Sequence, residues 1–183
     1  MKNYLITGCL LMVVFVSCSS GANQNAAAEK KDTVTLAAPI VYPFNAEYSS
    51  NFTTGDPKNS KLVLDLFMAW RDGRTKDLRQ YYADTVNADF ADGNHFSGTG
   101  DSLAELGAKI REEIQAMDYK ITAWMPVHAV DKNEDWVFVW YELYETHKDG
   151  SKDSTQSHGM YQVKNGRISY WGEYDQKFPA AEK

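Results

Sequence analysis

The sequence predicts an α+β domain in which three helices precede an antiparallel sheet. Between residues 56 and 117, apolar side chains recur every three or four positions, as they do along helices packed on one face. After Asp118 they alternate every second residue, as in strands. Lys148-Asp149-Gly150 and Asn165-Gly166 are turn sequences that favour antiparallel hairpins. A chain of 183 residues is long enough for one such domain.

The helical part begins at a clear capping signal. Asp56 is a favourable helix cap, and Pro57 suits the first helical position because its missing N–H would have no helical partner there. Ser102 and Glu105 form a capping box for a later helix. The elements predicted in this part are helices over 56–73, 75–82 and 102–117, with a brief strand over 86–90.

Four long strands are predicted after Asp118, over 119–130, 136–147, 155–164 and 167–174. The second carries large apolar residues on both faces, with Trp136, Phe138 and Trp140 on one and Val137, Val139 and Tyr141 on the other. A sheet that is apolar on both sides is covered on both sides. Helices can cover one face, so the pattern predicts a homodimer through the other.

The N-terminus predicts export and lipid attachment. Residues 5–16 form an apolar run that is too short for a membrane span but suits a signal peptide. Phe15-Val16-Ser17-Cys18 resembles a lipobox, which implies removal of residues 1–17 and lipidation of Cys18. Residues 18–55 are expected to be a flexible tether, 56–178 the domain and 179–183 a tail. The predicted location is a bacterial cell envelope, on the periplasmic face.

Composition excludes several classes of function. The net charge is −6 and there is no basic cluster, which argues against a nucleic-acid partner. Both cysteines, Cys9 and Cys18, precede the domain, so it has no disulfide and no thiolate ligand. The four histidines lack metal-ligand spacing, and no glycine-rich phosphate loop is present. We therefore expect neither a metal nor a cofactor.

The order of elements resembles the nuclear transport factor 2-like superfamily, which includes SnoaL-like polyketide cyclases and ketosteroid isomerases. The resemblance covers residues 60–175. It implies a cone in which three helices pack in the concave face of a strongly curved antiparallel sheet and leave a deep apolar pocket. The resemblance rests on the segments Ala69-Trp70-Arg71-Asp72-Gly73, Tyr82-Ala83-Asp84-Thr85-Val86, Phe96-Ser97-Gly98, Asp135-Trp136-Val137, Thr146-His147-Lys148-Asp149-Gly150, Asn165-Gly166-Arg167-Ile168 and Glu173-Tyr174-Asp175.

The resemblance suggests three candidate catalytic residues. Asp89 falls where ketosteroid isomerases keep their proton-shuttling carboxylate, and Glu173 where SnoaL-like cyclases place an acid/base carboxylate. His158 could assist either. The two isomerase donor positions fall at about Leu66 and Gly159, which have no side-chain donor, so ketosteroid isomerisation is not expected. The structural alternatives are a rim position for Asp89, a solvated strand end for Glu173 and the back of the sheet for His158.

Aromatic residues are the candidate pocket walls, although such rings also fill ordinary cores. The favoured function is binding of a small apolar or aromatic molecule without catalysis. One alternative is a cofactor-independent acid/base enzyme of the cyclase, dehydratase or isomerase class. The other is a structural dimerisation module whose cone is filled by its own side chains. The wall candidates are Phe67, Trp70, Trp124, Trp140, Tyr141, Tyr161 and Trp171.

Overall fold

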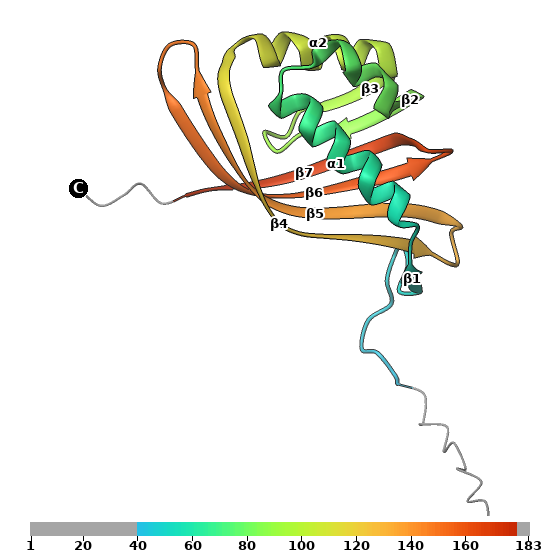
Figure 1. The fold of residues 1–183 in the computed structure, drawn as a ribbon. Coiled ribbons are helices and arrows are strands. Elements are labelled where there is room, and N and C mark those ends of the chain that lie inside the picture. The colour runs from blue at the N-terminus through green and yellow to red at the C-terminus, as the bar shows by residue number, and fades with distance from the viewer. Residues whose placement is uncertain (1–39, 179–183) are drawn as a thin grey trace, which may run out of the picture. The chain divides into compact units, whose positions relative to one another are not determined.

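The computed structural model describes residues 40–178, which include the compact unit that starts at Tyr42. The predicted signal peptide, Cys18 and the tail lie outside the described residues. A seven-stranded sheet carries the helices on one face (Figure 1), which confirms the α+β class. The elements are β1 (Phe52–Thr54), α1 (Pro57–Arg71), the 3₁₀ helix η1 (Thr75–Tyr81), β2 (Tyr82–Asp89), β3 (His95–Thr99), α2 (Gly100–Glu112), β4 (Ile114–Ala129), β5 (Glu134–His147), β6 (Lys152–Lys164) and β7 (Arg167–Lys177).

The strand order is β1-β4-β5-β6-β7-β2-β3, and one pair departs from the predicted antiparallel arrangement. β4 to β7 form the expected antiparallel meander, whereas β2 pairs with β7 in parallel. Local turn sequences set the direction of hairpin strands. No such turn joins β2 to β7, because α2 and the rest of the meander lie between them in the chain. Their relative direction is therefore set by long-range packing.

Helix α1 forms as predicted. The Asp56 carboxylate accepts a hydrogen bond from the Lys58 N–H at 2.8 Å, which satisfies one of the free donors at the helix start. Val63, Leu66 and Phe67 lie on the buried face. The chain leaves the helix through Gly73, whose φ of +66° favours glycine.

Helix α2 differs from its prediction at both ends. Thr99, not Ser102, is the cap, and its hydroxyl accepts from the Ser102 N–H at 3.2 Å. The helix starts at Gly100, where a Cβ would lie 2.4 Å from the Ala83 carbonyl oxygen, so only glycine allows this approach. It ends at Glu112, and Ile114 begins β4 instead of continuing the apolar helix stripe. Gly93, Gly98 and Gly100 predict an irregular loop before this helix, but the segment includes strand β3.

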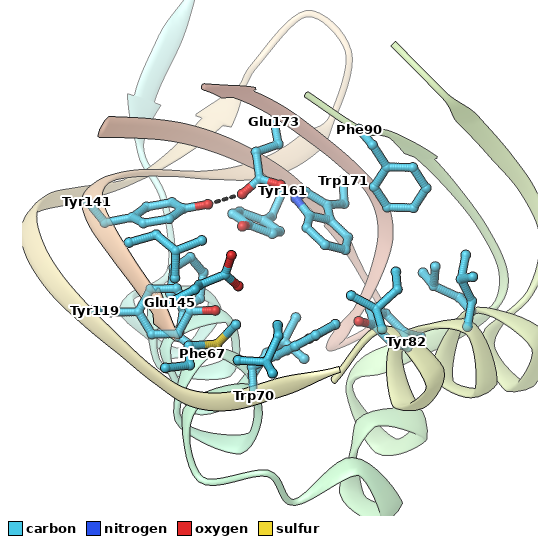
Figure 2. A pocket seen from close by; sticks show the side chains of 18 residues that line it. Phe67, Trp70, Tyr82, Phe90, Tyr119, Tyr141, Glu145, Tyr161, Trp171 and Glu173 are labelled. Atoms are coloured by element: carbon cyan, nitrogen blue, oxygen red, sulfur yellow. Dashed lines mark hydrogen bonds between the residues drawn. The ribbon is translucent and has the colours of Figure 1, made fainter. Parts of the chain in front are cut away.

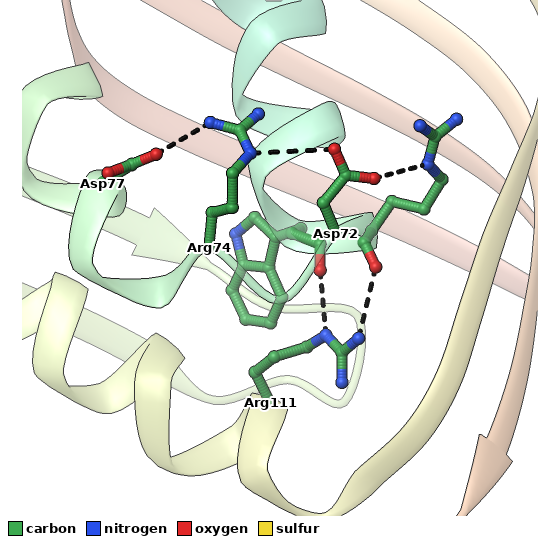
Figure 3. A network of polar contacts seen from close by, with 6 residues as sticks. Asp72, Arg74, Asp77 and Arg111 are labelled. Carbon is green, nitrogen blue, oxygen red and sulfur yellow. Dashed lines mark hydrogen bonds and ion pairs between the residues drawn. The ribbon is translucent and has the colours of Figure 1, made fainter.

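Arg111 joins helix α2 to the end of α1, as Figure 3 shows, and to the start of β4. Its guanidinium donates to the backbone carbonyls of Trp70 at 2.8 Å and Arg71 at 3.2 Å, at the end of α1. It also donates to the Ile114 carbonyl at 2.5 Å, at the start of β4. These bonds satisfy helix-end acceptors that have no partner within α1. Arg111 therefore holds the ends of α1 and α2 against the start of strand β4.

The sheet's outer face, away from the helices, is rich in aromatic side chains. Trp140 and Tyr174 remain 37 % and 63 % exposed on it. At one end, the segment expected to be tether packs on this face: Tyr48 lies edge-on to Trp136 at 5.8 Å, and the Trp136 indole N–H donates to the Tyr48 hydroxyl at 2.7 Å. Strand β1 then extends the sheet beside β4. Among residues 40–178, no helix has the length and apolarity to cross a membrane.

Candidate functional site

A cavity of about 180 Å³ lies between the sheet's concave face and helices α1 and α2 (Figure 2). Its lining is mostly apolar and includes residues from both helices and from strands β4 to β7. Five predicted wall residues line it, whereas Trp124 and Trp140 do not. The aromatic lining residues are Phe67, Trp70, Tyr82, Phe90, Tyr119, Tyr141, Tyr161 and Trp171.

Phe67 is the centre of the aromatic wall. Its ring centroid lies 4.8 Å from that of Tyr119, 4.9 Å from that of Tyr141 and 6.0 Å from that of Tyr161. The contacts with Tyr141 and Tyr161 are edge-to-face, an arrangement that aromatic pairs favour. Because these rings hold one another, the wall is preformed before any molecule enters.

The cavity volume limits the size of an occupant. An engineered apolar protein cavity of about 150 Å³ binds benzene, whereas pockets for drug-sized molecules hold about 300–1,000 Å³. At about 180 Å³ the cavity suits a molecule built around one ring. This volume also argues against a cone filled completely by its own side chains.

Glu173 is the most perturbed carboxyl group at the site. It lies on β7, two residues after Trp171, so both side chains face the cavity. The Tyr141 hydroxyl donates a hydrogen bond to its carboxylate (Figure 2). Burial raises the pKa of Glu173 to about 7, against the lowering effect of the Tyr141 bond; the charges of Asp175 and Glu145 add to the rise. Near neutral pH, Glu173 can therefore accept or donate a proton.

Glu145 is a second cavity carboxylate, which the sequence reasoning missed. Burial is the main cause that raises the pKa of Glu145. His147 opposes the rise, Asp153 and Asp175 support it, and Arg111 opposes it. The available signal was alternation: Glu145 follows Tyr141 and Leu143 at every second position of β5, and all three line the cavity.

The remaining polar groups in the cavity are donors. Burial raises the pKa of Tyr119, Tyr141 and Tyr161 far above neutrality, so their hydroxyls keep their protons. The Trp171 indole N–H is buried, and no acceptor among the described residues lies within hydrogen-bond distance of it. An unpaired buried N–H is unfavourable, so this group is available to an acceptor that enters the cavity.

Asp89 does not lie in the cavity, contrary to the catalytic role that the resemblance suggested. It pairs with Gly172 in the sheet register, which places its side chain on the outer face. The Tyr170 hydroxyl donates to it at 2.6 Å, and the His95 Nδ1 lies 2.6 Å from its other oxygen. These hydrogen bonds lower the pKa of Asp89. Asp89 is therefore an ionised residue of the outer face.

His158 and the two remaining tryptophans also lie away from the cavity. His158 stacks on Trp140 across the outer face, with ring centroids 4.8 Å apart, and burial lowers its pKa. Trp124 pairs with Val139 and shares the helix-covered side, but it is 53 % exposed beyond the cavity. Alternation separates the two faces of a strand without showing which face is concave, and this ambiguity explains the misplacement of His158 and Trp140. Among residues 40–178, no group of three or more His, Cys, Asp or Glu side chains is arranged to hold a metal ion.

No protein-family model and no curated protein sequence matches the chain. Solved structures do match it. An LEH-like epoxide hydrolase of M. tuberculosis superposes with a TM-score of 0.56 at 14 % identity, covering 65 % of this chain and 83 % of that one. An NTF2-like protein of unknown function from Exiguobacterium sp. 255-15 superposes with a TM-score of 0.52 at 17 % identity. The match covers 64 % of this chain and 98 % of that one.

A putative polyketide cyclase from Xanthomonas campestris pv. campestris gives a TM-score of 0.51 at 15 % identity, covering 64 % of this chain and 89 % of that one. This chain has the NTF2-like fold. Proteins described as a hydrolase and as a cyclase therefore share this fold. For this NTF2-like domain, the likeness concerns the fold, and any activity has to be argued from its own cavity.

Proposed function

We propose that the NTF2-like domain binds one small, largely apolar molecule in the cavity between the sheet and helices α1 and α2. The preformed hollow of about 180 Å³, walled by aromatic rings, is the observation that carries the proposal. Neighbours described as an epoxide hydrolase and a polyketide cyclase support a ligand-binding or catalytic use of the fold. Glu173 and the free indole N–H of Trp171 would orient one polar group of the ligand.

Benzyl alcohol, a one-ring probe with one polar group, tests this proposal on the full chain. At about ten times its Kd we expect it to raise Tm by about 4 °C, because binding to the folded state alone stabilises that state. Ile110→Trp should weaken binding at least about tenfold, since Ile110 lines the cavity and is 46 % exposed at its edge.

Met68→Trp is the matched control, because Met68 is a comparably exposed helical residue that does not line the cavity. It should bind the probe like the wild type. Equal binding by the wild type and Ile110→Trp, measured by calorimetric titration, would place the probe elsewhere and refute the proposal.

We further propose that a lipid on Cys18 tethers this domain to a bacterial cell envelope, on its periplasmic face. The signal-like run over residues 5–16 and the lipobox-like Phe15-Val16-Ser17-Cys18 support this role. Stable attachment through acyl chains requires more than one chain, as a lipidated cysteine provides. Cys18→Ser should release the protein from the membrane fraction; retention there would contradict the anchor.

A second copy of the chain is proposed to cover the outer face of the sheet. Trp140 and Met125 remain 37 % and 46 % exposed there, and His158 Nε2 is buried without a partner among residues 40–178. Contiguous exposed apolar surface of this kind is typical of protein interfaces. Trp140→Glu is expected to convert a dimer into a monomer in light scattering at micromolar concentration. Trp124→Glu, which alters a tryptophan outside this face, should remain dimeric; a monomeric wild type would refute the interface.

A second candidate function is acid/base catalysis on a carbonyl compound, favoured by the Glu173 pKa of about 7 inside the cavity. Glu173 would remove an α-proton as the C–H electron pair moves toward the carbonyl oxygen, and Trp171 Nε1 would donate to the resulting enolate. In D₂O, the wild type should then accelerate α-deuteration of cyclohexanone. Glu173→Gln should reduce the accelerated rate about 10²–10⁴-fold. Equal rates in both proteins would exclude this role.

A further inference from the structure

The cavity combines two carboxylates with aromatic walls and has no basic side chain in its lining. Glu173 enters from β7 and Glu145 from β5, and Figure 2 shows both pointing into the same space. The charge of Glu145 is one of the causes that raise the pKa of Glu173, after burial and the charge of Asp175. In the described part of the chain, no lysine, arginine or histidine belongs to the lining that could neutralise them.

Arg111, one of the basic residues that act on Glu145, is already committed to other acceptors. Arg111 affects the charge state of Glu145, but its guanidinium donates to three backbone carbonyls at the ends of α1 and the start of β4. It makes no hydrogen bond with either cavity carboxylate. Glu173 has one hydrogen bond from Tyr141, so its other oxygen remains open to the cavity.

Two carboxylates in a weakly polar cavity favour an entering cation, because a charge is stabilised more strongly there than in bulk water. The aromatic rings of Phe67, Tyr119 and Trp171 line the same cavity and add to this preference, since aromatic rings attract cations.

We infer that the ligand class of this cavity is a small organic amine, bound as the cation between Glu173 and Glu145 with its apolar body against the aromatic wall. This inference rests on the proposed function, because it names the ligand of the same cavity. The size limit set by about 180 Å³ restricts the amine to roughly one ring.

Three probes of nearly equal size separate charge from shape: benzylamine, benzyl alcohol and benzoate. Calorimetric titration of the full chain at about pH 8, where Glu173 is mostly ionised, is expected to give benzylamine at least a tenfold lower Kd than benzyl alcohol. Benzoate should bind most weakly. Glu173→Gln should remove most of the preference for benzylamine over benzyl alcohol.

Asp89→Asn is the matched control, because Asp89 also accepts a tyrosine hydrogen bond but lies on the outer face. It should keep the full preference for benzylamine. If benzyl alcohol binds as tightly as benzylamine, or Glu173→Gln keeps the preference, the amine assignment is wrong while cavity binding stands. If none of the three probes binds, both the assignment and the proposed function are overturned.

Discussion

Replacing Glu173 with glutamine is expected to flatten the pH dependence of stability and to make the protein more stable than the wild type above neutral pH. In the folded state the Glu173 pKa is raised from 4.5 to about 7, mainly because the group is buried. A raised carboxyl pKa means that stability is full below the unfolded value and is lost as pH rises through the folded value. At about 1.4 kcal/mol per pKa unit, the wild type loses about 3 kcal/mol over this interval.

Glutamine keeps the shape of Glu173 and can accept from the Tyr141 hydroxyl, but it never becomes charged. Urea unfolding at about pH 5 and about pH 8 measures the effect as the change in free energy of unfolding of each protein. Asp89→Asn is a control of opposite sign. Because hydrogen bonds from Tyr170 and His95 lower the Asp89 pKa, the wild-type contribution is present above the unfolded pKa and lost on acidification. Parallel pH profiles for the wild type and Glu173→Gln would contradict burial of an ionisable carboxyl group.

Phe67→Ala is expected to cost about 3–5 kcal/mol of unfolding free energy, the largest effect of a single core substitution considered for this domain. Phe67 is 6 % exposed and contacts three tyrosine rings of the cavity wall. Truncation removes those contacts and leaves a larger hole that the surrounding strands cannot close. The same change enlarges the binding cavity, because Phe67 is part of its lining.

Phe44→Ala is the matched control, since Phe44 is 86 % exposed. It should change the free energy of unfolding by less than about 0.5 kcal/mol. Denaturant unfolding at a pH where both proteins are folded measures the two changes. A loss below about 1 kcal/mol for Phe67→Ala would show that the wall does not depend on this ring.

The periodic patterns in the sequence identified most helices and strands, because caps and side-chain alternation depend on residues that are close together in the chain. Asp56 and Pro57 mark the start of α1 through cap geometry, and alternation after Asp118 marks the meander. The predicted end of α2 was wrong, because apolar residues at positions 114 and 117 suit the buried face of a helix as well as a strand that faces a cavity. The parallel pairing of β2 with β7 joins segments far apart in the chain, and no short sequence signal specifies it.

Position in the chain correctly predicted that Glu173 faces the cavity but wrongly predicted the same for Asp89. Glu173 and Trp171 share the inner side of β7, whereas register places Asp89 opposite Gly172 on the outer side. A strand reverses the direction of its side chains at every residue, so a difference of one residue in register exchanges the cavity for the outer surface. Glu145 was overlooked although it follows Tyr141 and Leu143 at every second position of β5, because alternation groups residues on one face without showing that this face lines a cavity.

The order of amino acids was sufficient to predict the α+β class, the helix start at Asp56, the long hairpins and an aromatic-rich interior, because propensities, caps and turns act over a few residues. Whether the interior would be hollow, and which carboxylates would face it, depended on strand register, sheet curvature and the anchoring of α1 and α2 by Arg111. Those features arise from contacts between residues distant in the chain. The position of the cavity and of the carboxylates in it follows from these long-range contacts together, so no local sequence pattern predicts it.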